Sequence, residues 1–209
     1  MKTLARVQRG LEALYRVSTG VDVDDYMIDE PTRDGLQPDR RPREQLLVCE
    51  HDGEMSLALF VDPRALVNLD RSDAGRLGDH NFGDFLLAVE GVSHFIYAIQ
   101  CARAERPVSQ LELELQAEVD KYVTCLLAIG PDASAPLRRR LFDDAAYEDD
   151  LDHDERDRYR AANDNASRYA AWLEGVFVTR SKIPEMLGEL RRFYRSGLAA
   201  KLGQIARAA

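Results

Sequence analysis

The stretch from Asn81 to Ile129 constrains the fold more than any other part of the chain, because it holds two helical patterns separated by a short break. The first pattern covers about residues 81–104 and is apolar on most of its circumference. The second covers about residues 109–129 and begins with a capping-box pattern, Ser109 followed by Glu112 at the third position. Helices joined by so short a connection should lie antiparallel, so the stretch predicts a central helix hairpin.

Charged residues lie on the apolar sides of both predicted helices. At about 100° per residue, Glu90 and His94 share one stripe of the first helix, whereas Glu114, Glu118 and Lys121 share one side of the second. Folding the hairpin about its turn would bring the two sets together inside an apolar interface. Unpaired charges there would cost several kcal/mol each, so the five groups are expected to pair or to shift their pKa values.

The opposite side of the second helix carries Glu112, Gln116 and Asp120. Three polar residues spaced four apart form one continuous stripe on a helix. The sequence therefore predicts that this stripe faces solvent.

Two interpretations of the charged cluster are open. It is either a buried ion-pair network that fixes the register of the helices, or an active site, since perturbed pKa values also mark catalytic groups. As a site, its catalytic residues would be Glu90, His94, Glu118 and Lys121, with His94 as a general base. A divalent metal would be held by Glu90, His94, Glu114 and Glu118, although the Lys121 ammonium competes for the same carboxylates. No other cofactor is expected.

A β-hairpin is predicted upstream, where Asp52-Gly53 separates two apolar runs at about 45–50 and 55–61. Two strands alone are marginally stable, so a third strand, for which residues 26–28 are the candidate, or a helix should cover them. Residues 20–44 lose periodicity and are expected to form a long surface segment.

Further amphipathic helices are expected before, between and after the two hairpins in the sequence. Residues 154–180 carry an apolar seam with alternating spacings of three and four, which should pack on the central hairpin or support a homodimer. The other expected helices cover about residues 3–17, 62–69, 135–142, 184–195 and 198–207. We therefore predict one α+β domain, mostly α, over residues 1–209, in which residues 1–80 form a helix plus β-hairpin subregion and residues 81–209 a multi-helix bundle.

Composition narrows the class of protein. A net charge of −9 and a pI of about 5.0 argue against nucleic-acid binding and favour a basic protein partner. No run approaches the roughly 18 apolar residues of a membrane span, and the N-terminus lacks the apolar region of a signal peptide. Three cysteines without CxxC spacing are typical of reduced thiols, so a soluble cytoplasmic protein is expected.

Standard catalytic motifs do not occur in the sequence: GxGxxG, the Walker A sequence and HExxH are all absent. The prediction is accordingly a non-catalytic cytoplasmic interaction or regulatory protein with an acidic surface. The alternative is an enzyme that uses the Glu/His/Lys cluster for acid–base or metal-assisted hydrolytic chemistry.

Overall fold

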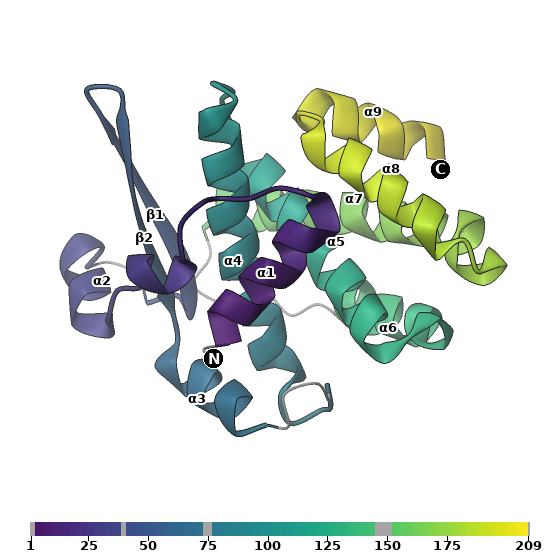
Figure 1. Ribbon diagram of the computed structural model, residues 1–209, viewed down its shortest axis with the longest axis horizontal. Helices are drawn as coiled ribbons and strands as arrows, with labels where there is room; N and C mark the ends of the chain where they lie inside the picture. The colour runs from purple at the N-terminus through teal and green to yellow at the C-terminus, as the bar shows by residue number, and fades with distance from the viewer. Residues whose placement is uncertain (1–2, 39–40, 73–76, 145–151, 209) are drawn as a thin grey trace. The chain divides into compact units, whose positions relative to one another are not determined.

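The structure, a computed structural model, describes residues 3–38, 41–72, 77–144 and 152–208. Within these ranges the chain is mostly helical, with nine α-helices and a small two-stranded antiparallel sheet (Figure 1), which confirms the mostly-α, α+β class. Two compact units are formed, Met1–Ala13 with Val17–Pro107, and Leu14–Arg16 with Val108–Ala209. The two helices of the predicted central hairpin belong to different units, so their antiparallel pairing and the single domain stay predictions.

The elements follow the predicted order along the chain. Those of the first unit are α1 (Thr3–Tyr15, whose last two residues belong to the second unit), η1 (Val23–Tyr26), α2 (Glu30–Leu36), β1 (Glu44–His51), β2 (Glu54–Val61), α3 (Pro63–Arg71) and α4 (Phe82–Arg103). Those of the second are α5 (Gln110–Ile129), η2 (Pro131–Ala133), α6 (Ser134–Arg138), the π-helical turn η3 (Arg139–Asp143), α7 (His153–Val176), η4 (Val178–Arg180), α8 (Ile183–Arg195) and α9 (Leu198–Ala208).

Side-chain caps set the starts of the helices. The Ser109 hydroxyl accepts a hydrogen bond from the Glu112 amide at 3.2 Å at the start of α5, as predicted. Asp152 and Glu155 form a complete capping box at the start of α7, with hydrogen bonds of 2.8 and 3.2 Å. Asp62 caps α3 through the Arg64 amide at 2.9 Å. The Ser109 cap joins residues three positions apart, which is why the sequence predicts it.

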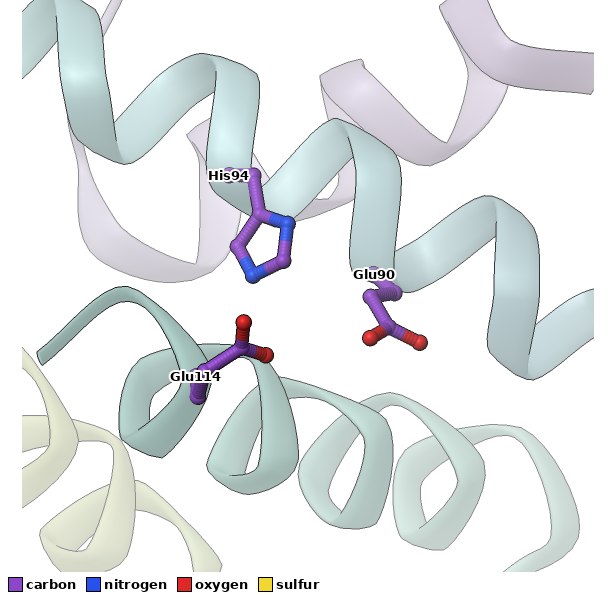
Figure 2. A group of neighbouring side chains, drawn as sticks. All are labelled: Glu90, His94 and Glu114. Carbon is purple, nitrogen blue, oxygen red and sulfur yellow. The ribbon is translucent and has the colours of Figure 1, made fainter. Parts of the chain in front are cut away.

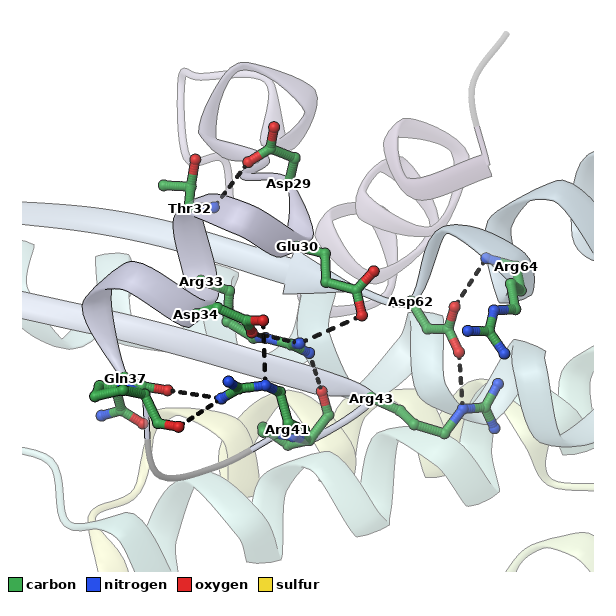
Figure 3. A network of polar contacts seen from close by, with 12 residues as sticks. Asp29, Glu30, Thr32, Arg33, Asp34, Gln37, Arg41, Arg43, Asp62 and Arg64 are labelled. Atoms are coloured by element: carbon green, nitrogen blue, oxygen red, sulfur yellow. Dashed lines mark hydrogen bonds and ion pairs between the residues drawn. The ribbon is translucent and has the colours of Figure 1, made fainter.

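The segment 20–44 is more ordered than its lack of periodicity suggests. Asp29 caps α2 by accepting the Thr32 amide at 3.0 Å, and a proline lies in the first helical turn. Arg33 is buried, with its guanidinium 4.2 Å from the centre of the Phe60 ring and an ion pair to Asp34 at 2.7 Å (Figure 3). Most of α2 is nevertheless exposed, so the segment lies at the surface as expected, and only its helix, which is too short to show a helical period, was not predicted.

The β-hairpin matches its prediction closely. Its two eight-residue strands pair antiparallel from Glu44 opposite Val61 to His51 opposite Glu54, and both turn residues between them have positive φ, 52° at Asp52 and 80° at Gly53. That conformation is the type I′ turn that Asp-Gly favours. Residues 26–28 contribute a single parallel bridge, in which the Ile28 amide donates to the Leu59 carbonyl at 2.9 Å.

The two ends of the hairpin differ in their surroundings. At its base, Arg43 binds Asp62 at 3.1 Å and Asp84 at 3.0 Å, which ties the start of β1 to the start of α3 and to α4. Figure 1 shows the turn end extending away from α2 and α3. Residues 48–57, which we name the distal hairpin, are exposed or half-buried throughout.

Helix α4 is the core of the first unit. Among the described residues it is the one helix whose length and composition would allow it to cross a membrane. Most of it is buried inside the protein, with Val89, Val92 and Phe95 each 0 % exposed. This is the burial expected of a core helix in a soluble protein.

Helix α5 is the core of the second unit and is buried on more sides than the sequence predicts. It packs along α7, whose seam residues Ala162, Ala166 and Leu173 are fully buried. The stripe expected to face solvent is also buried, since Gln116 is 0 % and Asp120 1 % exposed. That expectation is wrong because partners from distant parts of the chain cover the stripe.

Those partners form a buried polar network. The Tyr15 hydroxyl donates to Asp120, and the Gln116 amide donates to Asp120 at 2.9 Å and to the Tyr15 oxygen at 3.2 Å. Lys201 of α9 is 0 % exposed and donates to the Gln116 carbonyl oxygen at 2.5 Å, with its ammonium 5.0 Å from the Phe193 ring centre. Gln116 thus bridges a buried ammonium and a buried carboxylate, and each of their charges has a polar partner.

This network predicts a pH-dependent effect of Tyr15→Phe. At about pH 8 the variant should lose about 1–3 kcal/mol of unfolding free energy, because the Asp120 carboxylate loses a buried donor. Burial and the neighbouring Asp120 raise the pKa of Tyr15 well above its ordinary value. As pH rises above about 10, tyrosine therefore ionises in the unfolded chain but not in the folded one, so the wild type loses this stability and the difference between the two proteins narrows.

Urea unfolding of both proteins at about pH 8 and about pH 10.5 measures this difference. Tyr26→Phe is the control, since Tyr26 is half-buried and makes a ring contact with Phe95. An equal loss at both pH values would contradict the proposed role of the hydroxyl.

Candidate functional site

Two of the predicted site residues lie on one face of α4. Glu90 and His94 are four residues apart, and Figure 2 shows their side chains projecting from the same side of the helix. His94 is 7 % exposed and Glu90 is half-buried. Figure 2 also draws Glu114, which is on α5 in the second unit.

The His94 imidazole has a carboxylate beside it that the sequence analysis missed. Glu44, the first residue of β1, places Oε1 3.5 Å from His94 Nδ1, and both side chains are only 9 % exposed. Alternation along β1 puts Glu44 on the same face as Leu46, whose register partner Leu59 packs against α4. This alternation can be read from the sequence, but nothing local to Glu44 indicates that its neighbour is a histidine 50 positions away.

Gly91 makes the approach of Glu44 to α4 possible. A Cβ atom at this position would lie 3.1 Å from Glu44 Cγ and Oε1, and 3.2 Å from Leu59 Cδ1. Glycine inside a helix costs about 1 kcal/mol relative to alanine. The strand that carries Glu44 occupies the space that a side chain at this position would need. Close packing therefore accounts for a glycine inside α4.

The arrangement in the first unit has the chemistry of a positioned imidazole. A carboxylate beside one ring nitrogen holds the orientation of the ring. Imidazole nitrogen and carboxylate oxygen are also ligands that divalent transition metals accept, and Glu90 and His94 present both from one helical face. The residues present therefore fit either a general base or part of a metal site, with Glu44 as a positioning residue.

The predicted residues of the second unit pair with each other. Lys121 donates to Glu118 at 2.9 Å, three residues back on α5, and the two side chains are 11 % and 17 % exposed. An ammonium this close competes with any metal for the Glu118 carboxylate. Glu118 and Lys121 thus come together in one unit, and His94 and Glu44 in the other. The assembly of all five predicted groups into one cluster stays a prediction.

Thiol chemistry is not supported near these residues. Burial raises the pKa of Cys125 to about 12, so its thiol is protonated at neutral pH and is a poor nucleophile. The Cys101 sulfur is also buried and accepts a hydrogen bond from Arg106 at 2.8 Å. Both cysteines therefore act as packing residues.

Comparisons with known proteins do not identify a relative of this chain. No protein-family model, no curated protein and no solved structure matches it. The case for a function therefore rests on the chemistry of the residues themselves.

The close approach at Gly91 predicts an unusual effect of Gly91→Ala. Alanine normally stabilises a helix interior, but here its methyl group must displace Glu44 and the fully buried Leu59. We expect the unfolding free energy to fall by about 1–3 kcal/mol, the range for overpacking a core. Denaturant unfolding gives the value.

Gly188→Ala in α8 is the matched control. A Cβ atom there meets nothing within 4 Å, so the same change should raise the unfolding free energy by about 0.5–1 kcal/mol. A stabilising Gly91→Ala would show that β1 does not press on α4 at this point.

Proposed function

We propose that the chain is a soluble, cytoplasmic interaction protein without catalytic activity, which binds a protein partner through its distal hairpin. The observation that carries the proposal is an open strand edge. β1 pairs with β2 and, within the described parts of the chain, with no other strand. Its outer edge therefore presents backbone amides and carbonyls that an extended segment of another protein can pair with.

The composition of β1 supports this function. Edge strands are commonly protected from pairing by lysine, proline or a bulge, and β1 contains neither lysine nor proline. Four consecutive apolar residues, Leu46 to Cys49, lie along it, and Val48 is 48 % exposed opposite Leu57. A two-stranded hairpin is marginally stable by itself, so a third strand supplied by a partner would stabilise its exposed half.

The second candidate function is an enzyme, and the buried Glu44–His94 pair is the observation that favours it. Its catalytic residues would be the predicted Glu90, His94, Glu118 and Lys121, with acid–base or metal-assisted hydrolytic chemistry. The Glu118–Lys121 ion pair weighs against it, since each charge already has a partner.

Metal content and thermal stability separate the two functions. For an interaction protein we expect elemental analysis of the purified chain to find no stoichiometric divalent metal, and EDTA to leave the thermal midpoint unchanged. Stoichiometric metal that is lost on His94→Gln, together with a lower midpoint in EDTA, would make the enzyme the better function. Leu57→Ala, on the distal hairpin, is the control and should not change the metal content.

Site-specific photo-crosslinking tests the binding surface directly. A photoreactive phenylalanine at position 48 should give a discrete cross-linked product in extract of the source cells, because Val48 lies on the proposed surface. The same residue at exposed position 13 of α1 is the control. The product should disappear when excess unmodified protein competes, and mass spectrometry should map the link to an extended segment of one partner. Identical products from both positions would contradict the proposal.

A further inference from the structure

We infer that the partner segment is an extended peptide that combines apolar and basic residues and adds as a strand to the outer edge of β1. This inference rests on the proposed function and specifies the chemistry of its partner. Three properties of the distal hairpin support the inference: its apolar surface, its charge and its strand register.

One face of the distal hairpin carries exposed or half-buried apolar side chains and one acidic side chain, Glu50, whose register partner is Met55. Glu44 and Leu59 mark the face that packs against α4, and strand alternation continues this face outward through Val48, Leu57 and Met55. Leu59 is 0 % exposed, whereas Val48 is 48 % exposed and the other two are half-buried. An added strand would extend this face, so its residues on that side should be apolar opposite Val48 and basic opposite Glu50.

The end of the hairpin is acidic. Glu50, Asp52 and Glu54 are all exposed, and residues 48–57 contain no lysine or arginine, which gives this stretch three negative charges and no positive ones. Glu50 lies on β1 itself, and opposite charges on neighbouring strands stabilise pairing, so a basic residue in the partner suits this edge. The net charge of −9 on the whole chain would steer the same kind of partner.

A second copy of the chain suits the edge less well. Residues 48–54 of each copy carry three acidic side chains and no lysine or arginine, so two copies that met at this end would bring like charges together. Like charges directly opposite one another destabilise a strand pair. The acidic residues thus disfavour self-pairing and select a basic segment.

Peptide binding tests the inference on the full chain. The probes are peptides of about ten residues, a common strand length, which alternate valine with lysine, serine or glutamate. A fourth probe is the valine–lysine peptide N-methylated at every second residue, which removes the amide donors along one edge while keeping the charge. Fluorescence anisotropy measures affinity, and amide hydrogen exchange shows whether β1 becomes protected.

The valine–lysine peptide should bind most tightly and protect the amides of β1, and N-methylation should abolish that binding. Glu50→Lys with Glu54→Lys should weaken it by at least about tenfold. The matched control is Asp164→Lys with Glu185→Lys, which changes the net charge equally at exposed positions of α7 and α8 and should leave the affinity within about twofold.

Each other outcome overturns a defined part of the proposal. If the serine or glutamate peptide binds β1 as tightly as the lysine peptide, strand addition stands but the basic partner is wrong. If no peptide protects β1, the proposed function fails as well. If the control pair weakens binding as much as the hairpin pair, or N-methylation has no effect, the attraction is general charge rather than strand pairing. If sedimentation shows self-association that Glu50→Lys changes, the occupant is a second copy.

Discussion

Burying a charged side chain costs several kcal/mol unless a partner accompanies it, and this chain buries such side chains on both of its long apolar helices. On α5 the Asp120 carboxylate is matched through Gln116 to Lys201, and by the hydroxyl of Tyr15. On α4 the His94 imidazole lies beside Glu44. Each match joins segments far apart in the sequence, so the buried charges specify which elements pack together in each unit.

The Glu44–His94 contact also determines what the β-hairpin can do. Gly91 lets β1 lie close to α4, and Arg43 ties the same end of the strand to α3 and α4. The base of the hairpin is therefore fixed by packing and charge. The distal hairpin is exposed or half-buried, and among the described residues β1 pairs with no strand other than β2. A fixed base with an exposed end would suit the proposed recognition, because β1 would be held in place before a partner arrives.

The separation along the chain between interacting residues explains which site residues can be proposed from the sequence. His94, Glu90, Glu118 and Lys121 could be proposed from the sequence because polar residues on an apolar helix stand out within one or two turns. Lys121 and Glu118 are three residues apart on one helix, so their spacing alone predicts that they are in contact. Glu44 was missed because its neighbour His94 lies on another element. The buried stripe of α5 was misjudged for the same reason, since its cover comes from Tyr15 and Lys201.

The sequence by itself determined the mostly helical class, the hairpin turn at Asp52-Gly53 and the capped start of α5. Caps, turns and helical periods depend on residues within a few positions, where chain geometry alone brings groups together. Only the tertiary structure decided which side of α5 is buried and which carboxylate lies beside His94. The contacts that bury this side of α5 span 105 positions from Tyr15 to Asp120 and 85 from Gln116 to Lys201. No local rule specifies a partner over such separations along the chain.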